Sequence, residues 1–544
     1  MNCFTMIASE VPTLWSPLGI GLEIGLGIVL ATVYLGALAV ASIYGLHRYW
    51  LVVRYYRTRH RAPIARQGFD QLPHVTVQLP MFNESAVAGR IIDATCALDY
   101  PRDRLQIQVL DDSTDECASI TRDRVASWRE RGISIEHLHR TDRIGYKAGA
   151  LQAGLATATG EFIAVFDADF LPPRDFLMQT VPHFSDDAIG MVQAAWDHLN
   201  REDSLLTRCQ AMYLDSHFQI EHAARNRDGN WFNFNGTAGI WRREAIETAG
   251  GWQHDTLTED MDLSYRAQLV GWEFTYLQNL PCPAEVPPTI RAFKTQQHRW
   301  TKGTVQTAMK LLPRILKSNA AHSRKLEAMF HLTSPLVYPC VLLIALLMLP
   351  AVALQLRPFE HGSLSAGLFG LMILLLATAS GVTFYVAGQI ERRIGLLRTL
   401  GRVPALIALG VGMSVNNALA VVEALLKRES GFVRTPKFNA GSGHSARITA
   451  DTSGEITSGR LSRQTLSIAI ELLLGTYLLI CLAWSFTSLM TIWTAPFLAI
   501  FAAGYLSVGL SSIRWSALFA PRDAASLSTS PHDTSANLQR EPSG

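Results

Sequence analysis

Hydrophobic residues in this chain gather in long blocks near its two ends and in short runs between them. The first block, at about residues 20–44, is long enough to cross a bilayer, which takes roughly 20 apolar residues. No Lys or Arg precedes it, so it lacks the basic start of a signal peptide. Arginines crowd the basic linker that follows, residues 45–73. By the positive-inside rule this linker is cytoplasmic and residues 1–19 lie outside.

Between residues 74 and 312, short apolar runs alternate with helical patterns. The runs typical of buried strands are residues 74–79, 105–110, 162–166 and 190–194. The patterns typical of helices are residues 120–131, 145–158 and 263–270. Strands that alternate with helices predict an α/β domain with a mostly parallel sheet. Ligands of such sheets bind beyond the carboxyl ends of the strands.

Five more apolar blocks follow, and the charges between them limit how many can cross the membrane. They lie at residues 329–354, 365–387, 404–426, 466–486 and 492–511. If all five crossed, the stretch rich in Lys and Arg after residue 426 would lie outside, against the positive-inside rule. The block at 404–426 also contains Ser414, Asn416, Asn417 and Glu423. We therefore predict that it lies at the membrane surface, which leaves five spans with the C-terminus inside; a sixth ordinary span is the alternative.

The remaining segments are assigned by composition. We expect a further interfacial helix at residues 313–328 and a disordered polar tail at 524–544. The formal net charge of +2 does not suggest a nucleic-acid partner. The seven cysteines show neither CxxC nor Cys/His spacing, so neither a zinc site nor a disulfide framework is predicted.

Three clusters of carboxylates carry candidate chemistry: Asp111-Asp112, Asp167-Ala168-Asp169 and Thr258-Glu259-Asp260. Alternate residues of an extended chain point the same way, so Asp167 and Asp169 can face one site. Their oxygens suit Mg²⁺ or Mn²⁺ on a diphosphate. Each cluster also fits a plainer role, as a turn or as the cap of a helix. The local sequence leaves both interpretations open.

Residues Gln296 to Trp300 form a more specific pattern. A Trp near a membrane is usually an interface anchor. Beside Gln296 and Arg299, however, Trp300 could stack on a sugar while the guanidinium binds a phosphate. Two further features also have alternatives: residues 79–84 could admit a nucleotide base or be an ordinary loop, and Lys147 could meet a diphosphate or be a solvated lysine.

Taken in order, these motifs resemble a known family. The set consists of residues 78–84, 109–115, 145–151, 166–170, 234–241, 258–262 and 296–300. It is similar to the membrane-integrated family 2 glycosyltransferases of the cellulose synthase superfamily, especially the mannan and glucomannan synthase-like branch and its bacterial relatives. The resemblance implies a GT-A, Rossmann-like domain inserted between transmembrane helices.

The resemblance also implies roles for individual residues. Asp260 would be the catalytic base, and Asp169 would ligate Mg²⁺ or Mn²⁺, with Asp167 as a second candidate ligand. The residues that would bind the nucleotide sugar are Pro80, Glu84, Asp112, Lys147, Asp167, Gln296, Arg299, Thr435 and Lys437. Those that would meet the acceptor are Asn235, Gly236, Thr237 and Trp300. Thr435 and Lys437 belong to residues 431–438, which resemble the family's mobile gating loop.

The function implied is inverting transfer of a hexose from GDP-mannose or UDP-glucose to a growing β-linked polysaccharide such as mannan, glucomannan or β-glucan, with export. The alternative is a non-processive enzyme that adds one sugar to a lipid, as glucosylceramide synthase-like enzymes do. The expected partners are the donor, the polysaccharide acceptor, the bilayer and accessory export subunits. The expected location is a bacterial inner membrane, with the catalytic domain in the cytoplasm.

The chain departs from the family pattern at two points. Plant mannan synthases usually have Ser-Cys-Gly after the Arg-Trp pair, whereas this chain has Thr301-Lys302-Gly303, which weakens the transfer of their donor choice. Only a short polar tail follows the last predicted span, so we do not expect the cyclic-dinucleotide-binding domain of bacterial cellulose synthases.

Overall fold

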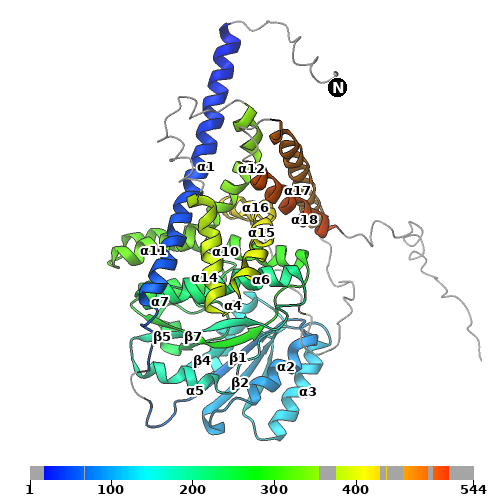
Figure 1. Ribbon diagram of the computed structural model, residues 1–544. Helices are drawn as coiled ribbons and strands as arrows, with labels where there is room; N and C mark the ends of the chain where they lie inside the picture. The colour runs from blue at the N-terminus through cyan, green and yellow to red at the C-terminus, as the bar shows by residue number, and fades with distance from the viewer. Residues whose placement is uncertain are drawn as a thin grey trace, which may run out of the picture.

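A computed structural model describes residues 17–65, 68–353, 375–428, 437, 458–487 and 494–513. Figure 1 shows a domain built around a β-sheet at one end and a group of helices at the other. The helix α1 (Pro17–Thr58) extends from the helical end down to the sheet domain. Its last turns bury Leu51, Val52 and Tyr55 against that domain. The first part of the basic segment expected at 45–73 is therefore a continuation of the helix.

The sheet has seven strands in the order β3-β2-β1-β4-β6-β5-β7. They are β1 (Val75–Met81), β2 (Leu105–Asp111), β3 (Ile135–His139), β4 (Phe162–Val165), β5 (Ile189–His198), β6 (Gly239–Arg242) and β7 (Glu273–Ala284). Only β6 runs antiparallel to its neighbours, β4 and β5. The mostly parallel sheet is thus confirmed, as are the four predicted strands, while β3, β6 and β7 were not predicted.

Helices cover both faces of the sheet, which explains why β1, β2, β4 and β6 are buried along their whole length. One face packs on α2 (Ser85–Cys96), α3 (Cys117–Glu130) and α5 (Phe176–Thr180). The other packs on α4 (Tyr146–Thr157), α8 (Arg243–Thr248) and α9 (Glu259–Leu269). The helices predicted over 120–131, 145–158 and 263–270 correspond to α3, α4 and α9.

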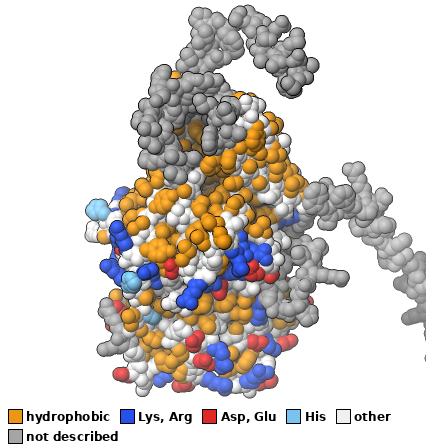
Figure 2. All heavy atoms as spheres, viewed as in Figure 1, with side chains coloured by type: hydrophobic (Ala, Val, Ile, Leu, Met, Phe, Trp, Pro, Cys, Tyr) orange, Lys and Arg blue, Asp and Glu red, His pale blue; other side chains and the backbone are white. Residues whose placement is uncertain are grey.

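Five helices in the described part of the chain are long and apolar enough to cross a membrane: Ile28–Thr58, His322–Met348, Leu396–Leu425, Gln464–Ser485 and Ala495–Ser512. The elements involved besides α1 are α11 (His322–Thr333), α12 (Val337–Ala353), α15 (Leu396–Gly412), α16 (Ser414–Leu425), α17 (Ser458–Ser485) and α18 (Ala495–Ser512). On the face shown in Figure 2, hydrophobic side chains gather over this helical end and charged ones over the sheet domain. The molecule therefore has the polarity of a chain with one end in lipid.

Two segments expected from the sequence do not correspond to single complete helices in the described residues. Residues 313–328 do not form one helix, because α10 (Ile290–Lys317) ends at Lys317 and α11 begins at His322. The span expected at 365–387 lies partly outside the described residues, and the described part ends in α14 (Ser380–Glu391). The segments 1–16 and 514–544, which include the expected tail, also lie outside them.

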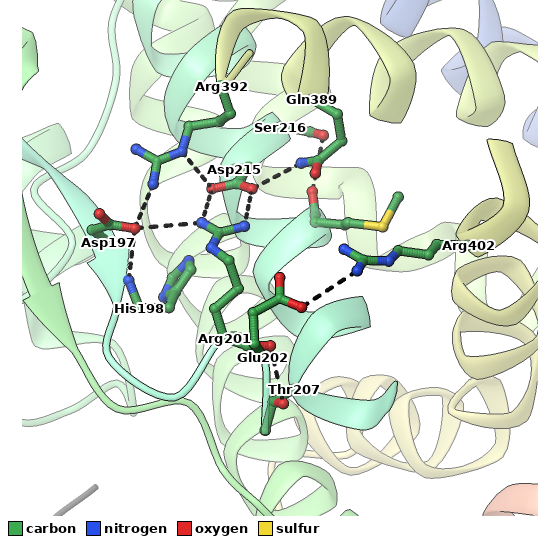
Figure 3. A network of polar contacts seen from close by, with 11 residues as sticks. Asp197, His198, Arg201, Glu202, Thr207, Asp215, Ser216, Gln389, Arg392 and Arg402 are labelled. Carbon is green, nitrogen blue, oxygen red and sulfur yellow. Dashed lines mark hydrogen bonds and ion pairs between the residues drawn. The ribbon is translucent and has the colours of Figure 1, made fainter. Parts of the chain in front are cut away.

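A buried polar network joins the sheet domain to α14 (Figure 3). Asp215, at the end of α6 (Leu205–Ser216), accepts hydrogen bonds from both terminal nitrogens of Arg201, at 2.6 and 2.7 Å. Gln389 of α14 donates a third at 2.8 Å. Arg392, which follows α14, pairs with Asp197 at 2.5 Å. Because Asp215 is only 1% exposed, this carboxylate depends on these partners for its charge.

Candidate active site

The carboxyl ends of the central strands, the start of α9 and one face of α10 surround a single cavity. Most residues predicted for donor, metal and acceptor line it: Pro80, Glu84, Asp112, Lys147, Asp167, Asp169, Asn235, Gly236, Asp260, Gln296, Arg299, Trp300 and Lys437. They come from segments more than 350 residues apart in the sequence, at Pro80 and Lys437. The fold thus brings together, around one cavity, motifs that each had both a functional and a purely structural interpretation in the sequence.

Lys147, near the start of α4, lies between two of these motifs. Its Nζ donates to Asp167 Oδ1 at 2.6 Å and to the carbonyl oxygen of Gly236 at 2.8 Å. Burial alone would lower the pKa of Lys147, but the charges of Asp167 and Glu259 outweigh burial and raise it. Lys147 is therefore a held cation inside the cavity and not a solvated surface lysine.

Asp169 lies deeper, 1% exposed, with Lys437 Nζ 2.6 Å from its Oδ2. Its other oxygen, Oδ1, is buried and has no hydrogen-bond partner among the described residues. Burial raises the pKa of Asp169, which the charge of Lys437 only partly offsets. An unpartnered carboxylate oxygen beside a second carboxylate, Asp167, fits a hard divalent cation.

Asp260 stands in the first turn of α9, directly against the turn that contains Gly236. A Cβ on Gly236, whose φ is +80°, would come within 2.9 Å of Asp260 Oδ2, so only glycine fits there. Burial first, and the neighbouring charge of Glu259 second, raise the pKa of Asp260 to about 7, against the opposing charge of Lys147. A carboxyl with a pKa near neutrality is suited to proton transfer. Thr258 is the N-cap residue of α9 without a side-chain cap hydrogen bond, and Glu259, Asp260 and Asp262 lie in the first turn, so the helix-start interpretation holds beside the role in the cavity.

Gln296, Arg299 and Trp300 share one face of α10, because residues three and four apart are neighbours on a helix. Trp300 lies at the cavity with its ring centroid 6.4 Å from that of Trp196. This position favours the sugar-stacking interpretation of Trp300 over the membrane anchor. Arg299 also lies close enough to lower the pKa of Asp260 by its charge.

Two predicted residues do not line the cavity. Thr237 is fully buried behind it, where its hydroxyl oxygen accepts a hydrogen bond of 2.9 Å from the backbone N–H of Asp167. Its hydroxyl therefore holds the backbone of Asp167, and its side chain does not reach the cavity. Thr435 lies outside the described residues, and Lys437 is the one described residue of the expected gating loop at 431–438.

Sequence reasoning missed several residues of this site. Arg140 forms a bidentate pair with Asp112, at 2.8 and 2.6 Å. Asp112, the residue predicted to contact the nucleoside, therefore already has a cationic partner. Arg143 stacks over the ring of Phe82, 3.3 Å from its centroid. The cavity wall also contains His198 and Glu285. None of these has a motif around it, so only the folded chain identifies them.

A second group of possible metal ligands lies behind Asp112. The ligand atoms of Asp111, His137 and His139 lie within 4.8 Å of one another. His137 Nε2 is 2.8 Å from Asp111 Oδ2, and the other oxygen of Asp111 accepts the N–H of Ser113. Both oxygens of the Asp111 carboxylate thus have protein partners, and these contacts fix the carboxylate at the end of β2.

Part of the chain is similar to known proteins. The family model described as glycosyltransferase like family 2 matches residues 73–303. A rice protein (Oryza sativa subsp. japonica) named probable glucomannan 4-beta-mannosyltransferase 6 is 44% identical over 254 residues. That match covers 46% of this chain and 44% of the rice protein, so less than half of the relative is matched.

Among solved structures, a mannosyltransferase (PcManGT) of Pyrobaculum calidifontis in complex with GDP-Man and Mn²⁺ is 23% identical, with a TM-score of 0.45, covering 75% of this chain and all of that one. S. aureus TarS is 14% identical with a TM-score of 0.33, covering 66% of this chain and 56% of that one. The motif-based resemblance to glucomannan synthase-like enzymes is confirmed by the rice protein and the family match. The chain carries a glycosyltransferase family 2 domain built on a GT-A-like mixed sheet.

Proposed function

We propose that this protein is an inverting membrane glycosyltransferase that transfers mannose from GDP-mannose to a growing β-linked polysaccharide. The observation that carries the proposal is the convergence of Asp260, with a pKa of about 7, and Trp300 on the cavity that holds Lys147, Asp167 and Asp169. The name of the rice relative supports mannose over glucose as the sugar. UDP-glucose is the second candidate donor.

The donor would lie across the carboxyl edge of the sheet. Pro80, Glu84 and Asp112 would line the nucleoside pocket, with the Asp112–Arg140 pair fixing its shape. Lys147, Gln296 and Arg299 would meet the diphosphate. Asp169, with Asp167 beside it, would hold Mg²⁺ or Mn²⁺, which when bound neutralises charge on the departing diphosphate. Lys437 would add a second positive charge on the same side.

The chemical step is a single displacement. Asp260 takes the proton from the acceptor hydroxyl, whose oxygen attacks the anomeric carbon of the donor sugar. The bond from that carbon to the diphosphate oxygen breaks, and the nucleoside diphosphate leaves with the electron pair. Attack from the side opposite the leaving group inverts the configuration, so an α-linked donor yields a β-linked product. Trp300 would hold the terminal sugar of the acceptor by stacking.

We further propose that residues 404–426 lie at the membrane surface, with five spans elsewhere and the catalytic domain cytoplasmic. Two contacts of the α15–α16 pair support this. Near its start, Arg402 pairs with Glu202 at 3.3 Å, and near its end, Glu423 pairs with Lys302 at 3.2 Å. Glu202 and Lys302 both belong to the glycosyltransferase domain. A segment that crossed the bilayer would separate its two ends by about 30 Å and lose one of these contacts.

The test uses membrane vesicles that expose the catalytic domain, with Mn²⁺ and either labelled GDP-mannose or labelled UDP-glucose. We expect GDP-mannose to label a product of high molecular weight, and Asp260→Asn vesicles with equal protein content to give none. If only UDP-glucose gave labelled polymer, UDP-glucose would replace GDP-mannose as the proposed donor. Label found only in a lipid-soluble product with one sugar would overturn the polymerase and favour transfer to a lipid.

A further inference from the structure

The helix that leads toward the acceptor side of the cavity contains a π-helical segment. Residues His217–His222 form a π-helix between α6 and α7 (Ala223–Arg227). Such an insertion widens one turn, is uncommon, and often occurs at functional sites. Here it brings His217 to Asn235, the residue that precedes the Gly236 turn against Asp260.

The contacts of His217 define the state of its ring. Asn235 Nδ2 lies 3.2 Å from His217 Nε2, and an amide nitrogen can only donate, so Nε2 is the acceptor. The other ring nitrogen, Nδ1, lies 3.0 Å from Glu221 Oε2 and carries the proton that it donates to this carboxylate. In this arrangement Nδ1 is the donor to Glu221 and Nε2 is the acceptor from Asn235.

Glu221 is itself held as an anion. Arg225 pairs with its other oxygen at 2.6 Å and binds Glu327 of α11 at 2.7 Å. Glu327 also contacts His47 of α1 at 2.9 Å. Although burial would raise the pKa of Glu221, the charge of Arg225 and the hydrogen bond from His217 lower it well below its usual value. The carboxylate thus remains an acceptor for His217.

The consequence for Asn235 is a fixed amide. Its Nδ2 points to His217, and its backbone N–H donates to Gln193 Oε1 at 3.0 Å. Its Oδ1 is buried without a hydrogen-bond partner in the described part of the chain, although the residue lines the cavity. Leaving a buried acceptor unpaired is unfavourable, so a partner that arrives with a ligand would be bound more tightly.

We infer that Glu221 and His217 are positioning residues that turn the Asn235 amide so that its oxygen accepts a hydrogen bond from a hydroxyl of the acceptor sugar. This inference rests on the proposed glycosyl transfer and names the group that selects the acceptor. It does not depend on which donor is used. The chain of ion pairs and hydrogen bonds begins at α1 and α11, passes through Arg225, and ends at the turn beside Asp260.

A double-mutant cycle tests this inference on the full chain in membranes. The measured quantities are the KM values for a short β-linked mannooligosaccharide and for the donor, in His217→Phe, Asn235→Ala and the double variant. Each single change should raise the acceptor KM about 3- to 10-fold, the size of one lost hydrogen bond, and leave the donor KM unchanged. Because His217 acts through Asn235, the double variant should be no worse than Asn235→Ala.

Two more variants separate positioning from loss of structure. His217→Gln keeps one acceptor and one donor, so it should recover most of the acceptor affinity. Asn226→Ala removes a hydrogen-bonded amide of α7 outside the cavity, bonded to Phe274 and Tyr276, and should leave the acceptor KM unchanged.

Additive effects in the double variant, or equal changes of donor and acceptor KM, would overturn the inference. An unaltered protein that transfers sugar from neither donor would instead overturn the proposed function, and the inference with it. An active parent with unaffected His217 and Asn235 variants would overturn the inference alone.

Discussion

The titration of Asp260 makes a quantitative prediction. Burial and the charge of Glu259 raise the pKa of this carboxyl to about 7. A general base acts only when deprotonated, so transfer should be lost as the pH falls through this value. With one such group, about half of the molecules are active at pH 7, about one tenth at pH 6 and about one hundredth at pH 5.

Glu259→Gln tests the cause of this pKa. It removes a neighbouring negative charge without changing the shape of the side chain, so the pKa of Asp260 should fall. For two like charges at an assumed separation of about 10 Å and an effective dielectric of about 20, the repulsion is roughly 1.7 kcal/mol, or about one pKa unit. The acid limb of the rate profile should therefore move about one unit toward lower pH.

The assay is the initial rate of sugar transfer by the full chain in membranes between pH 5 and 9, with metal and both substrates saturating. Asp260→Asn is the blank and should lose at least about 100-fold in rate. Glu247→Gln, an exposed glutamate of α8 outside the cavity, removes the same charge elsewhere and should leave the profile unchanged. An acid limb at the same pH in Glu259→Gln and in the parent would refute this account of Asp260.

Three further predictions concern the metal, the network between domains and a close approach of helices. Asp169→Asn should abolish the stimulation of transfer by added Mn²⁺, measured as rate against metal concentration; unchanged stimulation would exclude Asp169 as the ligand. Asp215→Ala removes the closer of the two carboxylates that pair with partly buried Arg201 and leaves Asp197 at 3.4 Å (Figure 3), so it should destabilise the protein by about 1–3 kcal/mol, seen as a lower Tm in detergent; an unchanged Tm would contradict it. Gly303→Ala would bring a Cβ to 2.5 Å from Thr258 Cγ2 and should reduce transfer, whereas Gly401→Ala, with nothing within 4 Å, should not.

The sequence predicts those parts of the fold that depend on local information. Strands β1, β2 and β4 are apolar runs between polar segments. Asp112 follows β2 directly, and Asp167 and Asp169 lie shortly after the end of β4. Because parallel strands end at the same edge, their acidic ends had to meet. The arrangement of the candidate donor site was therefore predictable before any contact was known.

The remaining parts depend on contacts between distant segments. β6 has only four residues, and it is a strand because it lies antiparallel between β4 and β5. β7 contains Gln278, Asn279 and Pro281, and its pairing with β5 shifts register at Ala194/Ala195, so its pattern does not alternate regularly. Arg140 has no motif of its own and is recognised only by its pairing with Asp112. Strand pairing and tertiary contacts therefore determine the structure at these positions, and a local sequence pattern does not.

The residues after Trp300 show how contacts change the meaning of a motif. Thr301 and Lys302, where the chain departs from the plant mannan synthase pattern, and the following Gly303 are buried and do not line the cavity. Lys302 pairs with Glu423 of α16 and donates to the carbonyl oxygen of Arg428 at 2.7 Å. Gly303 lets α10 approach Thr258, the residue before α9. These positions thus join the helix of Trp300 to α16 on one side and to the Asp260 turn on the other. Since none of them reaches the donor, we expect the difference in sequence to alter the packing of α10 and not the choice of sugar.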